Sequence, residues 1–247
     1  MDPLILFLLF FAGIVGGGVN AIAGGGTFFT FPAMIASGLD PLTANASNAV
    51  AIYPGHAAAV PAYREELRAA GRPLLLRSSI VAFGGLLGAG LLLQTGAIAF
   101  EGLVPWLLLA ATLLFAFGPA LASASARLRS ESRWLTSGVE FLFAVYGGYF
   151  GAGLGVLLMA ALTIIGIRDV QMANAQKNWL ATIITTISVL VFALAGAVAW
   201  PQTIAVLFGA LIGGYSGARL AKRIPTGALR IVVIIVGLVL SAYYFTT

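Results

Sequence analysis

The sequence predicts an all-α polytopic membrane protein made of two inverted-topology repeats, with short broken or re-entrant helical segments near the midplane of the bilayer. Three observations support this fold class. Of 247 residues, 60% are hydrophobic and only 9% are charged, whereas a soluble domain carries about 25% charged residues. The apolar residues form runs long enough for membrane helices, and the two halves of the chain resemble each other at a constant offset. The composition excludes a soluble protein.

Apolar runs between polar residues, glycines and prolines define the expected helices in order. About 20 apolar residues are needed to cross the hydrocarbon core as a helix. Two of the runs have only 12 residues, which reach about 18 Å at 1.5 Å per residue and cannot cross alone. The first run is expected to be a membrane helix rather than a signal peptide, because no basic residue precedes it. The predicted segments are 3–23, 27–38, 42–63, 78–95, 103–123, 135–153, 155–166, 171–196, 201–219 and 229–246.

The basic residues indicate how the chain is oriented. Eleven of the 13 Lys and Arg residues fall in three short stretches that we expect to be loops. The positive-inside rule places such loops in the cytoplasm, so both termini are expected outside a cell inner membrane. The net charge of +5 therefore reports topology, and no nucleic-acid partner is expected. The three stretches contain Arg64, Arg68, Arg72 and Arg77; Arg127, Arg129 and Arg133; and Arg219, Lys222, Arg223 and Arg230.

An internal repeat relates the two halves at an offset of 129 residues. It aligns 23–26 with 152–155 and 44–46 with 173–175, together with two glycine clusters. The stretch after 42–63 is basic, while the counterpart stretch after 171–196 has no basic residue, so the halves are expected to have opposite orientations. Inverted repeats are typical of secondary transporters. We predict repeats at 1–123 and 135–247 joined by a basic cytoplasmic linker at 124–134; whether the short segments cross or re-enter stays open.

Polar residues gather around the two short segments, where the repeat predicts a binding site. Non-helical backbone inside a membrane protein must be buried or line a cavity, and the amino-terminal ends of half-helices attract anions. Lys177 either extends back to the interface or faces a polar cavity beside several amides. The amides either bind an anion or cap and cross-link helices. The candidate substrate-binding residues are Lys177, Asn45, Asn48, Asn174, Asn178, Asn20, Thr27, Gly25, Gly26 and Gly153.

Other polar residues carry weaker expectations. His56 and Glu140 are candidates for proton coupling, although Glu140 is expected to pair with an arginine and a lone histidine is as often a helix-packing residue. Asp40 and Asp169 are expected to cap helices. Gly214-Tyr215-Ser216-Gly217 fits the pattern around an intramembrane serine protease nucleophile, but the equivalent of Ser216 in the first half is Leu87, which favours packing. No enzyme activity is expected, and without cysteine neither a metal site nor a cofactor is expected.

These motifs resemble the TauE/SafE sulfite-exporter-like family, also called the toluene-sulfonate uptake permease family. The resemblance rests on residues 12–13, 20–27, 31–33, 38–41 and 44–48 in the first half, and on 147–151 and 173–178 in the second. It covers almost the whole chain and implies transport of sulfite, organosulfonates or related sulfur oxyanions. Relatives often have an acidic residue at the position of Asn20 and a lysine near Asn48, where this chain has Ala49.

The expected function is therefore secondary transport of a small sulfur-containing oxyanion by alternating access between the two halves, with export as the favoured direction. The alternatives are an anion channel or facilitated pathway, an uptake permease and, least favoured, a membrane protease. The lipid bilayer and the oxyanion are the expected partners, and a homodimer is left open.

Overall fold

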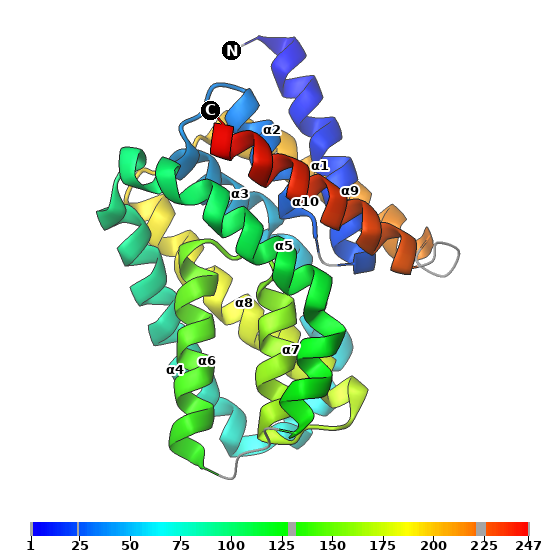
Figure 1. Cartoon of the computed structure of the whole chain (residues 1–247). Helices are drawn as coiled ribbons and strands as arrows, with labels where there is room; N and C mark the ends of the chain where they lie inside the picture. Colours follow the sequence, from blue (N-terminus) through cyan, green and yellow to red (C-terminus); the bar gives the residue numbers. More distant parts are fainter. Residues whose placement is uncertain (1, 24, 128–131, 221–225, 247) are drawn as a thin grey trace.

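The computed structural model describes residues 2–23, 25–127, 132–220 and 226–246, and over these residues the chain forms α-helices and one short 3-10 helix, with no strand. This confirms the predicted all-α class. Five stretches of the described chain are long and apolar enough to cross a membrane. The helices, shown in Figure 1, are α1 (Pro3–Ala23), α2 (Thr27–Ala36), α3 (Pro41–Ala57), η1 (Val60–Tyr63), α4 (Arg64–Thr95), α5 (Ala97–Arg127), α6 (Arg133–Tyr149), α7 (Leu154–Ile165), α8 (Val170–Leu194), α9 (Trp200–Leu220) and α10 (Thr226–Thr246).

The two short segments are helices, as predicted. α2 has 10 residues and α7 has 12, so they reach about 15 and 18 Å. Glycines bound α7 on both sides: Gly153 (φ 75°) and Gly166 (φ 93°) have left-handed backbones, which an L side chain would disfavour. Two of the breaks in the helical bundle therefore depend on glycine.

The helices that follow the short segments begin in the same way in both halves. Asp40 accepts a hydrogen bond from the backbone N–H of Thr43 at 3.0 Å, and Asp169 accepts one from Met172 at 2.7 Å. Each carboxylate satisfies an amide that has no partner within the helix and interacts favourably with the positive end of the helix dipole. Both aspartates are helix caps, as the sequence predicted.

The prediction of a basic loop before residue 78 is wrong. α4 already begins at Arg64, and the stretch from Arg64 to Arg77 is helical, with a kink where Gly71 (φ 62°) leaves the helical conformation two residues before Pro73. This part of the chain is amphipathic and contains no long apolar run, although its alanine, leucine, arginine and glutamate residues all favour helix.

Glycines allow the closest helix contacts, as the sequence predicted. A Cβ atom on Gly213 of α9 would overlap the carbonyl oxygen of Ile14 in α1, and one on Gly88 of α4 would overlap the carbonyl oxygen of Val145 in α6. Small residues let helix backbones approach each other in this way. The α1–α9 and α4–α6 pairs each join one helix from the first half to one from the second.

The packing pattern is the same in both halves when the chain is shifted by 129 residues. The first helix of each half packs on the fourth helix of the other half, and the third helices α3 and α8 pack on each other. In Figure 1, α1 runs down from the amino terminus, while its counterpart α6 runs up. The opposite orientation of the halves in a bilayer stays a prediction. Within the predicted linker 124–134, residues 128–131 lie outside the described residues, as do Gly24, Lys222 and Arg223.

Arg230, which the sequence placed in a basic loop, lies in α10 and holds α5. Its guanidinium donates hydrogen bonds to the carbonyl oxygens of Phe115, at 2.9 and 2.7 Å, and Ala116, at 3.0 Å. Proline has no N–H, so Pro119 leaves the carbonyl of Phe115, four residues earlier, without its helical donor. Arg230 supplies the donor that the helix lacks.

Candidate functional site

A pocket lies where α3 and α8 meet the break between α6 and α7. α3 contributes two asparagines and a histidine, α8 contributes two hydroxyl side chains, and the break contributes backbone and glycines. Both halves of the chain therefore line the pocket, as expected for a site between repeats. The lining residues are Asn45, Asn48, Ala49, Ile52, His56, Gly147, Gly148, Phe150, Gly151, Leu154, Thr185, Ser188 and Phe192.

Asn45 connects the first half to the broken segment of the second half. Its side chain is 2% exposed, and its Nδ2 donates a 2.9 Å hydrogen bond to the carbonyl oxygen of Tyr149, the last residue of α6. Its Oδ1 is buried and has no hydrogen-bond partner among the described residues. Since a carbonyl oxygen can only accept a hydrogen bond, the contact to Tyr149 identifies which amide atom is the donor.

Asn48 lies one turn further along α3 and is held by the short helix of its own half. Thr30 of α2 donates a hydrogen bond to Asn48 Oδ1, and Asn48 Nδ2 lies 3.5 Å from Thr27 Oγ1. Asn48, Thr27 and Thr30 are all buried. The first-half break is therefore closed by side chains from α2 and α3.

Asn20 lies near the end of α1, close to the first glycine break. A Cβ on Gly26 would come within 2.8 Å of Asn20 Cβ, and one on Gly55 of α3 would come within 3.5 Å of Asn20 Nδ2. Gly25 packs against Val233 of α10. Thus Asn20, Gly25 and Gly26 form part of the first break and do not line the pocket.

Lys177 lies in α8 beside the start of α7. Its Nζ donates a 3.1 Å hydrogen bond to Asn174 Oδ1, one turn earlier in the same helix, and its Cδ lies within 3.9 Å of where a Cβ on Gly155 would be. Gly153 precedes α7 and provides no side-chain cap for its first turn. Asn178 follows Lys177 and is half-buried. The structure therefore brings an ammonium group and an amide to the positive end of a short helix.

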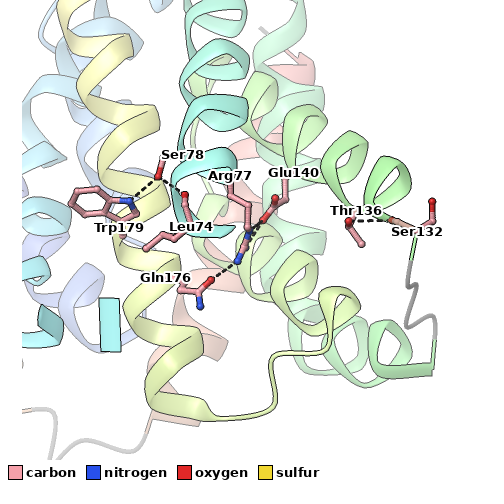
Figure 2. A network of polar contacts seen from close by, with 8 residues as sticks. All are labelled: Leu74, Arg77, Ser78, Ser132, Thr136, Glu140, Gln176 and Trp179. Carbon is pink, nitrogen blue, oxygen red and sulfur yellow. Dashed lines mark hydrogen bonds and ion pairs between the residues drawn. The ribbon is translucent and has the colours of Figure 1, made fainter. Parts of the chain in front are cut away.

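Glu140 forms a buried ion pair with an arginine. The Arg77 side chain from α4 donates through Nε to Glu140 Oε1 at 2.7 Å and also through Nη2, and its Nη1 donates to Gln176 Oε1. Figure 2 shows Arg77 between Glu140 of α6 and Gln176 of α8. Glu140 is 1% exposed, so the pairing accounts for how a carboxylate is accommodated in the bundle.

Two further contacts hold the third helix of each half in position. Trp179 Nε1 of α8 donates to Ser78 Oγ of α4 at 2.9 Å, next to the Arg77–Gln176 contact (Figure 2). In the other half, Ser47 Oγ of α3 accepts a 2.9 Å hydrogen bond from the N–H of Ala199, just before α9. Because Gln176 and Trp179 face α4, the contacts set the rotation of α8 and hence the direction of Lys177.

The serine and glycine that suggested a protease, Ser216 and Gly217, are involved in helix packing. Ser216 donates hydrogen bonds to the carbonyl oxygens of Ile212 and Gly213 in its own helix. Gly217 lies against Gly18 of α1, where an added Cβ would clash with the backbone. His56 lines the pocket between α3 and α8. The glycine pattern around Ser216 therefore serves the α1–α9 contact.

Sequence reasoning missed three polar residues of this region. Thr30 binds Asn48, and Thr185 and Ser188 line the pocket. Threonine and serine are common in membrane helices, so a hydroxyl side chain carries little information alone. The signal that was available is spacing: Thr27 with Thr30, and Thr185 with Ser188, are three residues apart and therefore lie on one face of a helix.

An all-helical bundle with several membrane-length helices, two short helices bounded by glycine breaks and buried amides at those breaks defines a membrane transport protein. The chain belongs to the sulfite exporter TauE/SafE family, whose profile matches residues 9–244.

Similar proteins support the same class. The probable membrane transporter protein YfcA of Escherichia coli K12 is 27% identical over 242 residues, which cover 98% of this chain and 90% of that protein. A probable membrane transporter protein of Haemophilus influenzae is 26% identical over 239 residues, covering 96% and 93%. A third, ORF9 of Sinorhizobium sp, is 27% identical over 237 residues, covering 96% and 91%. No solved structure gives a significant match.

Proposed function

We propose that the protein is a secondary transporter of small sulfur-containing oxyanions, such as sulfite or a sulfonate, that binds its substrate between the two halves. The observation that carries the proposal is the position of Lys177. It places a positive charge beside Asn174 and next to the first turn of α7. The name of the family agrees with a sulfur oxyanion.

The surroundings of Lys177 suit an anion for two physical reasons. The amino-terminal end of a helix carries about half a positive charge, which attracts oxyanions; the N–H groups of Leu154, Val156 and Leu157 in α7 already donate to the carbonyl oxygens of Gly151 and Gly153, so the dipole provides the attraction there. The Lys177 ammonium has three donors, of which Asn174 accepts one, so an oxyanion can accept the others. The amides of Asn174 and Asn178 lie on the same helix and complete the proposed half-site.

The polar residues of the first half are proposed to bind the substrate when the helix breaks next to α2 and α7 rearrange. In this structure, the donor of Asn45 is bonded to Tyr149 and Asn48 is bonded to α2. Asn20, Thr27, Gly25 and Gly26 form the first break, which is the counterpart of the α7 start. Alternating access would let the amides of each half exchange a contact within the protein for a contact with the anion.

Export is the proposed direction across a cell inner membrane. A negative interior favours outward movement of an anion by about 2.3 kcal/mol per charge at 100 mV. Import against the same potential would require a co-transported cation. The proposed orientation, with basic stretches in the cytoplasm and both termini outside, is consistent with either direction.

The test is sulfite or sulfonate flux in proteoliposomes that contain Lys177 variants. We expect Lys177→Ala to reduce flux at least tenfold, because the anion loses its charged partner, while Lys177→Arg keeps part of the activity. Arg168→Ala is the matched control, since it removes an exposed positive charge nine residues earlier and should leave flux unchanged. Flux through Lys177→Ala equal to that of the unmodified protein would contradict the proposed role of Lys177.

A channel or facilitated pathway for the same anions is the alternative mechanism. Among the described residues, a small pocket is lined by both halves, which agrees with a central site in a transporter. Saturable flux and accelerated exchange of labelled substrate against unlabelled substrate would support alternating access. Flux that rises linearly with concentration and shows no exchange would support a channel.

A further inference from the structure

We propose that the pocket at the α6–α7 break binds a small monovalent cation, for which Na⁺ is the ion to test. The oxygen ligands would be Asn45 Oδ1, the hydroxyls of Thr185 and Ser188, and carbonyl groups at the end of α6. The existence of this cation site does not depend on the substrate. Only its role as a coupling site rests on the proposed function.

The first evidence is the unpaired oxygen of Asn45. The residue lines the pocket and is 2% exposed, and its Oδ1 is buried without a partner among the described residues. A buried polar atom without a partner costs about 1–3 kcal/mol, so such an atom in a native structure needs an explanation. Because Nδ2 is bonded to Tyr149, the atom of Asn45 left without a partner is an acceptor, which suits a cation or a donor but not an anion.

The second evidence is the direction of the hydroxyl groups on α8. Thr185 Oγ1 donates to the carbonyl oxygen of Ala181 at 2.8 Å, and Ser188 Oγ donates to that of Ile184 at 2.9 Å. Each hydroxyl has one proton and two lone pairs. With the proton used inside the helix, the lone pairs remain for the pocket that both residues line. These hydroxyls are therefore acceptors, like Asn45 Oδ1.

The third evidence is the helix end at the pocket. α6 ends at Tyr149, and Gly147, Gly148 and Gly151 line the pocket. The carboxyl-terminal end of a helix carries about half a negative charge on its last carbonyl groups. Carboxyl-terminal ends of broken helices coordinate Na⁺ or H⁺ in transporters of known architecture. The end of α6 therefore reaches the pocket, as does Leu154 at the start of α7; the oxygen atoms that the pocket offers come from α6, α3 and α8.

The described pocket residues include no carboxylate and no thiol. This favours a monovalent cation over a divalent ion or a soft metal. Divalent ions bind through carboxylates, and soft metals bind through thiolates; the described lining contains neither. His56 is the titratable side chain of the lining. Lys177 lies two turns before Thr185 and three turns before Ser188 on α8 and is not among the pocket residues, and an anion bound to it would offset the charge of the cation. A monovalent cation bound by neutral oxygens fits this surface.

The binding test is thermal unfolding of the full-length protein in detergent, with no oxyanion present. NaCl is compared with KCl and N-methyl-D-glucamine chloride at equal ionic strength. Because a ligand that binds only the folded state stabilises it, we expect the midpoint to rise with Na⁺ in a saturable manner. Equal midpoints in NaCl and in N-methyl-D-glucamine chloride would overturn the proposal and leave water as the partner of Asn45.

A matched pair of serine variants locates the site. Ser188→Ala removes one proposed ligand and is expected to raise the half-saturating Na⁺ concentration at least tenfold. Ser241→Ala is the control, because Ser241 is also buried and donates to the carbonyl four residues earlier, in α10, but does not line the pocket. If both variants respond to Na⁺ as the unmodified protein does, the ion binds elsewhere and the proposed site is wrong.

Transport assays separate this inference from the proposed function. If Na⁺ binds and couples, an imposed Na⁺ gradient will drive anion flux, and Ser188→Ala will lose that dependence. Na⁺-dependent stability without sulfur oxyanion flux would support the cation site and contradict the proposed substrate. Flux driven by a pH gradient, without any effect of Na⁺ on stability or flux, would overturn the cation site and keep the transporter.

Discussion

For Glu140, the sequence predicted the type of partner, an arginine, but not which arginine it would be. Its position inside an apolar segment predicted a pairing with an arginine. The partner, Arg77, lies 63 residues away on α4, in a part of the sequence that was expected to be a loop. Spacing along one helix identifies partners three or four residues away, but it carries no information about which residues face each other across two helices. The same limit hid the contact between Arg77 and Gln176.

Breaking the Arg77–Glu140 pair on one side is expected to be more harmful than removing both charges. Arg77→Met leaves a buried carboxylate without its partner, which costs about 3–5 kcal/mol of unfolding free energy. The double variant Arg77→Met with Glu140→Gln removes both charges and should recover much of this loss. Equilibrium unfolding in detergent of both single variants and the double variant measures the coupling energy.

Arg68→Met provides the control for this cycle, because Arg68 is exposed on the same helix. Its unfolding free energy should change by less than about 0.5 kcal/mol. Additive effects of the two single substitutions at the ion pair would show that Arg77 and Glu140 do not stabilise each other.

At the scale of elements, the sequence predicted the ends of most helices well, but it missed the starts of α4 and α5 and the end of α3. Glycine breaks and cap residues are local signals, so α2, α7 and the starts of α3 and α8 followed from the sequence. The first half of α4 did not, because an amphipathic basic helix resembles a loop when only apolar runs are considered. As a result, Arg64, Arg68 and Arg72 extend from a helix with a kink at Gly71 and not from a loop.

The contact between α1 and α9 should depend on one glycine much more than on its neighbour. A Cβ on Gly213 would clash with the backbone of Ile14, whereas the nearest atom to a Cβ on Gly214 is 3.9 Å away. Gly213→Ala should therefore lower the unfolding free energy by about 1–3 kcal/mol, while Gly214→Ala should be neutral or stabilising, since alanine favours helix. Thermal unfolding of the two variants in the same detergent compares them.

A larger loss of stability from Gly214→Ala than from Gly213→Ala would contradict this arrangement of α1 and α9.

For the whole molecule, the two halves pack according to the same pattern, and this could be predicted only in part. The offset of 129 residues identifies which segments correspond. It does not predict that α1 would pack on α9 and α6 on α4, because correspondence between segments says nothing about which of them touch. For the candidate site, the sequence likewise predicted many of the polar residues but not where each of them lies. The sequence grouped the asparagines together, whereas the structure divides them between the first break, the pocket and the neighbourhood of Lys177.

The opposite orientation of the halves can be tested because the chain has no cysteine, so a single introduced thiol is the sole site for labelling. Arg68→Cys lies in a basic stretch, and Ala195→Cys lies in the corresponding connection of the second half; both positions are exposed. We expect a membrane-impermeant thiol reagent to label Ala195→Cys in intact cells, and Arg68→Cys only after the membrane is opened. Labelling of both from the same side would contradict the inverted arrangement.

The exchange of helices between the halves also limits how the protein can move. α1 and α9 are joined through glycines that leave no space between their backbones, and so are α4 and α6. A motion that preserves these contacts cannot treat residues 1–123 and 135–247 as two rigid bodies, since each tightly packed pair contains one helix from each. The tightly packed units are instead two mixed pairs, and the other helices, among them α2 and α7 with the breaks next to them, can change position or shape between these pairs.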